Sequence, residues 1–249
     1  MSPDHPSPFD ETYFSTGTYE KVSFQTGTQY WWSNRFYALL TKRYGPPSGR
    51  LLEVGCGLGH LLARLHPRYE TVGVDVNPWA LQRASRNAPH ASLHQASAED
   101  LTIFEDGSFQ VLIAKHVVEH LSDPDRAIAE FGRVIAPGSF AILATPNLDS
   151  PMRTRKGEDW IGYKDPTHIS LRRPIHWLAS LERVGFRPIR LISDGFWDPP
   201  YIGWLPTALQ KILFGLPGGL QAIAGLSILP VNWGESVIML LRKGGYGTE

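Results

Sequence analysis

The feature that most constrains this chain is a glycine-rich loop, Gly55-Cys56-Gly57-Leu58-Gly59, which directly follows a short apolar segment. Residues 50–54 have the composition of a buried strand, and the apolar spacing that begins within the loop predicts a helix over 58–65. Closely spaced glycines let the backbone approach a ligand, while the amino end of the following helix directs N–H groups toward it. The sequence therefore predicts an α/β unit with a nucleotide-like ligand at this loop.

An acidic residue near the end of the next predicted strand, residues 71–76, supports that interpretation. Asp75 lies 20 residues after Gly55, where a carboxylate at a strand end can accept both hydroxyls of a ribose. The dinucleotide-binding pattern would place its third glycine at His60, so the loop departs from that class. The combined spacing favours a binding loop over a plain turn.

The rest of the chain alternates between helix-like and strand-like segments. Asn77 before Pro78 and Asp123 before Pro124 are typical of helix starts. Helices are expected over 28–44, 78–87, 123–135 and 173–184, and further strands over 92–95, 109–114, 140–144, 187–194 and 235–242. This order predicts a Rossmann-like, seven-stranded, doubly wound sheet, mainly parallel with an antiparallel last strand.

An almost uncharged segment separates the last two predicted strands. Within residues 199–234 the only formal charge is Lys211, and residues 212–231 carry none. A run of this length raises the question of a transmembrane span, but Pro217, Pro230 and several glycines are expected to break a continuous helix. A lid, an oligomer interface or a monotopic membrane contact is therefore expected here.

Three parts of the chain follow from these patterns. Residues 1–27 are expected to form a mobile or lid-like N-terminal segment, and the apolar insert spans 195–234. The predicted core comprises 28–194 and 235–243.

Composition narrows the expected partners. Lys plus Arg and Asp plus Glu number 24 each, so no net field favours nucleic acid. Cys56 is the single cysteine, which excludes an internal disulfide and fits a cytoplasmic location. Residues 1–10 lack the apolar core of a signal peptide.

Several segments together resemble class I S-adenosylmethionine (SAM)-dependent methyltransferases. Residues 53–59 are similar to the first motif of that family. The further similar segments are 97–101, 104–109, 116–124 and 133–138. They span about residues 30–190 and resemble the broad group that contains ubiquinone-biosynthesis O-methyltransferases and many natural-product methyltransferases. The resemblance implies SAM as cofactor and a methyl-transferring enzyme.

The resemblance also implies which residues contact SAM. Those expected at its methionyl part are Arg35, Glu53, Gly55, Gly57 and Gly59. In this group Glu53 would reach the ammonium and Arg35 the carboxylate.

Asp75 would bind the ribose, and Lys115 would line the cofactor. Those expected around the adenine are Ser97, Ala98 and Glu99, with Ser97 at a position where many relatives have aspartate.

A histidine cluster follows the fourth predicted strand. His116, Glu119 and His120 would share one face of a helix, and His168 follows the fifth strand, so all four are expected at the carboxyl edge of the sheet. The pattern resembles the metal site of some ubiquinone O-methyltransferases and of small-RNA 2′-O-methyltransferases, with His116 replacing a glutamate. That replacement would favour a softer divalent ion such as Zn²⁺ or Fe²⁺. A general base at His116 or His168 is the rival interpretation.

Three functions remain open at this point. The leading one is methylation, on oxygen, of a small apolar or aromatic acceptor, because aromatic residues are frequent over 13–32 and 160–233. A metal-assisted RNA 2′-O-methyltransferase is the second, although the balanced charge argues against it. A SAM-binding partner subunit without catalysis is the third. Peripheral membrane contact or homodimerisation is expected to involve residues 199–234.

Overall fold

A computed structural model describes residues 25–245 of the protein, so the predicted N-terminal segment and its aromatic residues up to Phe24 lie outside the described residues. Its sheet has seven strands in the order β3-β2-β1-β4-β5-β7-β6. The strands are β1 (Arg50–Val54), β2 (Glu70–Asp75), β3 (Ser92–Gln95), β4 (Phe109–Lys115), β5 (Ile135–Pro146), β6 (Phe186–Ser193) and β7 (Ser236–Lys243). β7 pairs antiparallel with β5 and β6, and the other pairs are parallel. The predicted fold class is confirmed.

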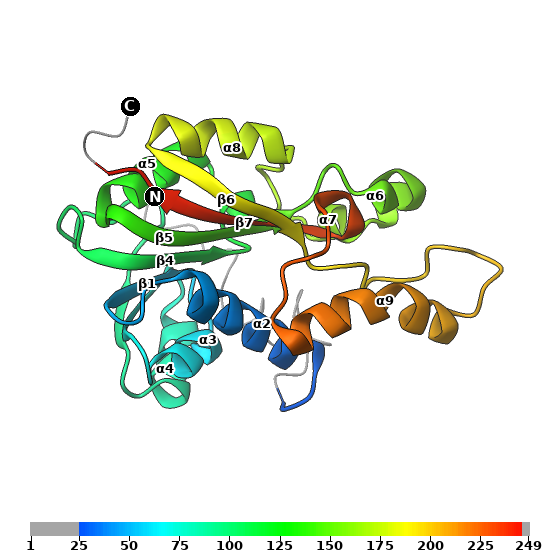
Figure 1. Ribbon diagram of the computed structural model, residues 1–249, viewed down its shortest axis with the longest axis horizontal. Coiled ribbons are helices and arrows are strands. Elements are labelled where there is room, and N and C mark those ends of the chain that lie inside the picture. The colour runs from blue at the N-terminus through cyan, green and yellow to red at the C-terminus, as the bar shows by residue number, and fades with distance from the viewer. Residues whose placement is uncertain (1–24, 246–249) are drawn as a thin grey trace.

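Helices cover both faces of this sheet (Figure 1). One face packs against α2 (Gln29–Tyr44), α3 (His60–Leu65) and α4 (Pro78–Asn87), and the other against α5 (Pro124–Val134) and α8 (Pro174–Arg183). Successive strand residues alternate between the two cores, as a pleated strand requires: Leu51 faces α2 and α3, whereas Leu52 faces α5 and α8. Each strand of the centre is therefore apolar on both sides, which explains the continuous apolar runs in the sequence.

The predicted helix starts at Asn77 and Asp123 are confirmed. The side chain of Asn77 accepts hydrogen bonds from the backbone N–H groups of Trp79 and Ala80, and that of Asp123 accepts one from Arg126. Such caps satisfy backbone donors that the first turn of a helix leaves open. They fix where α4 and α5 begin relative to the sheet edge.

The insert between β6 and β7 differs from the sequence prediction. It contains α9 (Thr207–Ala224), which continues through Pro217, so the expected break at that proline is wrong. The proline leaves the carbonyl of Leu213 without its helical partner, and because Leu213 is 55% exposed, water can bind there. Within residues 25–245, no helix has both the length and the apolar character needed to cross a membrane.

A glycine pair explains why α9 packs so closely on the body. A Cβ atom on Gly218 would lie 2.6 Å from the carbonyl oxygen of Asp194, and one on Gly195 would lie 2.8 Å from the Cα of Gly218. The glycine in α9 therefore permits a close backbone contact with the end of β6. This contact offsets the cost of glycine within a helix.

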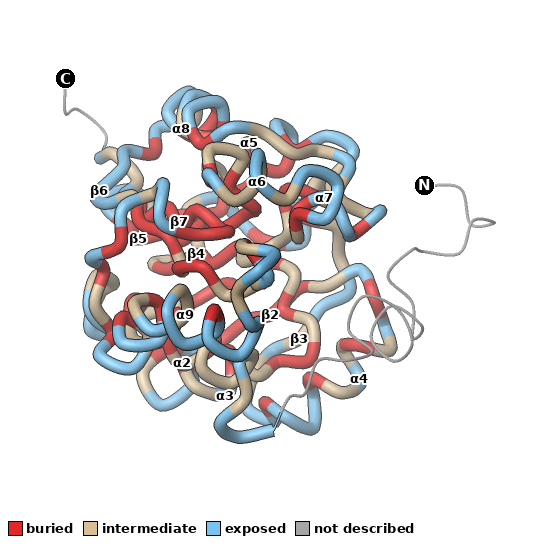
Figure 2. Tube along the Cα trace, turned by 90° about the vertical axis from the view of Figure 1, so that its right-hand side faces the viewer, coloured by how far each residue is buried: buried red, intermediate tan, exposed pale blue. Residues whose placement is uncertain are grey.

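The parallel strands end at one edge of the sheet, between two groups of helices. α9 lies beside α2 on one side of this edge, and the short helices α6 (Pro151–Lys156) and α7 (Ile161–Lys164) lie on the other (Figures 1 and 2). Ligands of open α/β sheets bind outside the carboxyl ends of the strands, so the candidate site is sought there.

Candidate active site

The glycine loop after β1 has a backbone that only glycine adopts readily. Gly55, Gly57 and Gly59 have φ angles of 68°, 50° and 76°. The N–H groups of Gly55 and Cys56 both donate to the carbonyl of Val74, at 2.8 and 3.0 Å, so the end of β2 holds the loop. A Cβ on Gly55 would lie 2.4 Å from Cγ2 of Val117. The loop is therefore kept tight against the segment after β4.

Asp75 is fixed at the end of β2 by two backbone donors. Its Oδ2 accepts from Gly57 N–H at 2.8 Å, and its Oδ1 accepts from Asn77 N–H at 2.9 Å. Burial raises the pKa of this carboxyl, and these donors oppose that rise. Because each carboxylate oxygen can accept more than one hydrogen bond, both remain able to accept ribose hydroxyls.

Glu53 presents a carboxylate oxygen that has no partner among the described residues. The side chain comes from β1, is 5% exposed, and leaves its Oε2 without a hydrogen bond. Burial raises the pKa of Glu53 to about 8, even though the positive charge of Lys115 opposes the shift. An unsatisfied buried acceptor is costly, so this oxygen indicates a cationic or donating ligand.

Lys115, the last residue of β4, lies between that acid and α2. Its Nζ donates to Oδ1 of Asn34 at 3.2 Å and lies 5.1 and 4.9 Å from the ring centroids of Tyr30 and Tyr37. Burial lowers the pKa of Lys115 to about 8, although the charges of Glu53 and Asp194 favour the ammonium form. Lys115 and Glu53 therefore each favour the charged form of the other.

Asn34 is a residue that the sequence analysis missed. Its buried Nδ2 has no acceptor among the described residues, and its side chain lines a cavity of about 610 Å³ between the amino ends of α2 and α3. A donor at Asn34 and an acceptor at Glu53 suit the carboxylate and ammonium of an amino-acid group. The only signal in the sequence was a polar residue on an aromatic helix, which is ordinarily interpreted as a surface position.

Arg35, by contrast, is engaged elsewhere. Its Nη1 donates to the carbonyls of Ala222 and Ile223 at 3.2 and 2.7 Å, in the last turn of α9. The guanidinium satisfies open carbonyls at a helix C-terminus, where a cation is favoured, and its expected contact with the carboxylate of SAM stays a prediction. Asn34, one position earlier on α2, faces the cavity instead.

The segment after β3 that was predicted to frame an adenine is ordered by local hydrogen bonds. Oγ of Ser97 accepts from the N–H of Glu99 at 3.1 Å. Oε1 of Glu99 accepts from Oγ of Ser122 at 3.0 Å and from the N–H of Asp123 at 2.8 Å. These bonds join the segment, with buried Ala98 at its centre, to the start of α5. The carboxylate of Glu99 is therefore used at least in part for support.

The histidine cluster begins directly after β4. His116 has a φ of 54°, the only positive value at a non-glycine residue among residues 25–245. Its Nδ1 lies 3.0 Å from Oε1 of Glu119, which is fully buried. The segment is a short 3-10 helix over Val118–His120 that leaves His116 outside, so the expected shared helical face does not form. Strained backbone of this kind concentrates at functional sites.

The charge of Glu119 is stabilised within the cluster. Burial acts to raise the pKa of this carboxyl, but the hydrogen bond from His116 and the nearby His116 and His120 outweigh it, so the pKa lies below its usual value. An ionised Glu119 accepts a hydrogen bond from the protonated Nδ1 of His116. Nε2 is therefore the basic nitrogen of that ring. The pair has the arrangement of a carboxylate–histidine base.

His120 and His168 lie next to this pair. Nδ1 of His168 donates to the carbonyl of Gly162 at 2.7 Å, and Nδ1 of His120 lies 2.9 Å from Oγ1 of Thr167, whose hydroxyl donates to Asp165. Both rings therefore present Nε2 as their acceptor nitrogen. Burial lowers the pKa of His120.

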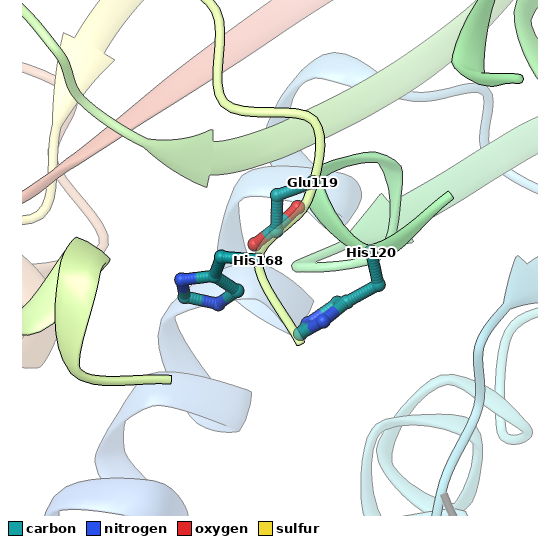
Figure 3. A group of neighbouring side chains, drawn as sticks. All are labelled: Glu119, His120 and His168. Atoms are coloured by element: carbon teal, nitrogen blue, oxygen red, sulfur yellow. The ribbon is translucent and has the colours of Figure 1, made fainter. Parts of the chain in front are cut away.

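The four predicted metal ligands converge only in part. Glu119, His120 and His168 bring one ligand atom each to within 4.8 Å of one another (Figure 3), whereas Nδ1 of His116 bonds to Glu119. These atoms could hold a divalent ion or serve as acid–base groups.

A second buried acid, Asp194, also escaped the sequence analysis. It follows β6. Its carboxylate accepts hydrogen bonds from Nε1 of Trp197 at 2.6 Å and from the N–H of Ser236 at 2.8 Å. Burial raises the pKa of Asp194. Its charge acts on both His116 and Lys115. Asp194 therefore ties the insert to the electrostatics of the site.

An aromatic cluster fills the space between α9 and the sheet edge. The rings in contact are Phe196, Tyr201, Phe214 and Trp233. Buried Glu235 accepts from the hydroxyl of Tyr201 at 2.7 Å and from Nε1 of Trp160 at 2.6 Å. Of the aromatic residues predicted to line an acceptor pocket, Trp160 and Tyr201 are thus buried structural residues.

Comparison with known proteins identifies the family. Residues 29–191 match a family model described as a methyltransferase domain, which is more than half of the chain. The chain belongs to this family. It is a class I SAM-dependent methyltransferase, in agreement with the fold and with the glycine loop.

Relatives of this methyltransferase include proteins that are named for quinone-type acceptors. The ubiquinone biosynthesis O-methyltransferase of Caulobacter sp. (strain K31) is 34% identical over 39% of this chain and 41% of its own length. The 2-methyl-6-phytyl-1,4-hydroquinone methyltransferase of Synechocystis is 24% identical over 72% of this chain and 61% of its own length. The chain therefore matches less than two thirds of the length of either relative.

Solved structures share the fold at low identity. The YcgJ protein of Bacillus subtilis superposes with a TM-score of 0.61 at 17% identity, covering 86% of this chain and all of that one. This likeness agrees with the strand order found here.

The residues present fit SAM. Among residues 25–245, Oε2 of Glu53 and Nδ2 of Asn34 have no hydrogen-bond partner and match an ammonium and a carboxylate, and Asp75 matches a ribose. When bound, SAM supplies a methyl group on a sulfonium, so transfer requires mainly a positioned nucleophile. The individual contacts with SAM stay predictions.

The substitution Gly55→Ala is expected to weaken both stability and SAM binding. The left-handed φ costs about 1–2 kcal/mol for alanine, and the overlap with Val117 adds about 1–3 kcal/mol. Gly138→Ala is the matched control, because Gly138 has a φ of 77° and nothing within 4 Å of its Cβ position. Denaturant unfolding should show a larger loss for Gly55→Ala, and calorimetry should show weaker SAM binding for that variant alone. Equal losses would contradict the predicted overlap.

Proposed function

We propose that this methyltransferase transfers the methyl group of SAM to a hydroxyl oxygen of a small apolar or aromatic acceptor. The observation that carries the proposal is the pair of His116 and buried Glu119 at the end of β4, with Nδ1 and Oε1 3.0 Å apart. A hydroxyl needs a proton acceptor to become a good nucleophile near neutral pH, whereas an amine does not.

The chemistry of the pair follows from its hydrogen bond. The acceptor hydroxyl would give its proton to Nε2 of His116 as its oxygen bonds to the methyl carbon. The bond from that carbon to the sulfur would break in the same step, with S-adenosylhomocysteine as the leaving group. Ionised Glu119 would stabilise the resulting imidazolium and hold the ring in the correct tautomer. The rings of His168 and His120 lie 4.7 Å apart beside Glu119, and they would position the acceptor oxygen or pass the proton on to solvent.

The apolar nature of the acceptor is supported by the aromatic cluster and by the relatives. Phe196 and Trp233 are parts of the insert that lie at the sheet edge, and pockets for small molecules are lined mainly by such groups. One relative is named a ubiquinone biosynthesis O-methyltransferase, and another a 2-methyl-6-phytyl-1,4-hydroquinone methyltransferase. A phenolic or hydroquinone acceptor combines an acidic hydroxyl with an apolar ring.

The proposal is tested by the release of S-adenosylhomocysteine with a matched set of acceptors. Catechols and hydroquinones that carry alkyl tails should be methylated on oxygen, and anilines of the same shape should not. Methylation of the anilines alone would overturn the choice of oxygen. Binding of SAM without turnover on any acceptor of the set would favour a non-catalytic partner subunit.

Treatment with a chelator distinguishes a His116–Glu119 base from a metal mechanism at the same cluster. If His116 is the base, dialysis against EDTA leaves turnover unchanged. A loss that Zn²⁺, Fe²⁺ or Mg²⁺ restores would instead assign Glu119, His120 and His168 to a divalent ion.

A further inference from the structure

The surface of α9 is unusual because its apolar side chains face outward. Leu213, Leu216 and Leu220 are 54–56% exposed, and Leu209, Ile212 and Ile223 on the same side are 43–62% exposed. Together with Trp204, which precedes the helix and is 83% exposed, we define these seven residues as the α9 apolar face. The face extends over roughly 20 Å, since an α-helix rises about 1.5 Å per residue.

The two glutamines of α9 lie on its inner side. Oε1 of Gln221 accepts from the N–H groups of Ile228 and Leu229, and its Nε2 donates to the carbonyl of Ser193. Gln210 bonds in the same way to the backbone of Tyr201, Ile202 and Leu205. Both glutamines are buried, so α9 is held by polar contacts beneath it and presents its apolar side as a preformed surface.

Charge distinguishes the kinds of partner that this surface fits. Residues 199–234 contain no acid, and their single cation, Lys211, is exposed on α9. Protein interfaces have a polar rim with about one hydrogen bond per 100–200 Å², yet the exposed polar side chains of this segment are only Thr207, Lys211 and Asn232. A lipid surface requires no such hydrogen bonds, and residues 199–234 contain no acid that its headgroups would repel.

We propose that the α9 apolar face binds the surface of a lipid membrane, with the helix lying along it. Trp204 would lie at headgroup level, where tryptophan is favoured, and the leucines would enter the acyl boundary. α9 borders the sheet edge that carries the candidate active site (Figure 2), so this orientation would bring that edge near the membrane. The inference does not depend on the identity of the acceptor atom.

Co-sedimentation with vesicles tests this proposal on the full chain. The wild type should bind phosphatidylcholine vesicles that contain phosphatidylglycerol. The triple variant Leu213→Gln, Leu216→Gln, Leu220→Gln should lose binding on the order of 100-fold, because each leucine transfers about half of its surface. Lys211 lies on the side of α9 opposite this face by helical spacing, so Lys211→Glu should change binding to these vesicles by less than about twofold.

Matched controls separate the face from general hydrophobicity and from misfolding. The variant Ile103→Gln, Ile175→Gln, Ile189→Gln removes three exposed side chains on other elements and should bind vesicles like the wild type. All variants should keep the wild-type thermal midpoint and SAM affinity. Wild-type binding by the α9 triple variant would overturn the proposal. The proposal would also be overturned if light scattering showed that the wild type forms a dimer whether or not lipid is present and that the triple variant is a monomer.

Discussion

Replacement of Glu119 by glutamine is expected to lower kcat for a hydroxyl acceptor by about 10²–10⁴-fold, with little change in the affinity for SAM. The amide cannot carry the charge that stabilises a protonated His116, and it can hold the ring in the wrong tautomer. His116→Ala should cause a loss of the same size. The double variant should be no worse than either single one, because the two residues act as one unit.

The acidity of the acceptor distinguishes a base from a structural role. A nitrocatechol, whose hydroxyl is already ionised near neutral pH, should lose much less activity in either variant than an unsubstituted catechol. His176→Ala, at an exposed position of α8, is the matched control and should keep full activity. Equal losses with both acceptors would contradict a role for His116 as the base.

The second large effect concerns Glu53 and SAM itself. Glu53→Gln is expected to weaken SAM binding by about 10- to 100-fold, the usual range for a lost hydrogen bond between charged groups. In the free protein the pKa of Glu53 is raised to about 8 by burial, so near pH 6.5 the carboxyl is mostly protonated. The ammonium of SAM requires the carboxylate. Binding must therefore expel a proton, and affinity rises by up to about tenfold per pH unit between pH 6 and 7.5.

Calorimetry in two buffers of different ionisation enthalpy measures this proton directly. At pH 6.5 the wild type should release about one proton when SAM binds, and Glu53→Gln should release close to none. Glu105→Gln, at an exposed turn, serves as the charge-matched control. Unchanged proton release in the Glu53 variant would assign the linkage to another group.

Much of this fold is predictable from local chemistry. Strands β1 and β3 and helix α4 begin and end at the predicted residues, because apolar runs, Asn77 as a cap and Pro78 at the first turn act within a few residues of one another. The glycine loop and Asp75 were predictable for the same reason: their spacing is short and their backbone demands are specific.

What could not be predicted depends on contacts between distant parts of the chain. Asn34 and Arg35 are neighbours on α2, and only the packing of that helix decides that Asn34 faces Lys115 while Arg35 faces α9. Pro217 is tolerated because the carbonyl that it leaves open lies at an exposed position. Asp194 becomes part of the site because β6 ends beside β7, at a position that sequence periodicity does not report.

The neighbouring contacts of Asn34 and Arg35 have a thermodynamic consequence. One side chain borders the cavity between the amino ends of α2 and α3, and the other holds the C-terminus of the helix that carries the apolar face. Any shift of α2 that accompanies occupation of the cavity therefore changes the position of the C-terminus of α9. Such coupling is reciprocal by necessity. If a surface bound at α9 changes the affinity for SAM by some factor, SAM changes the affinity for that surface by the same factor.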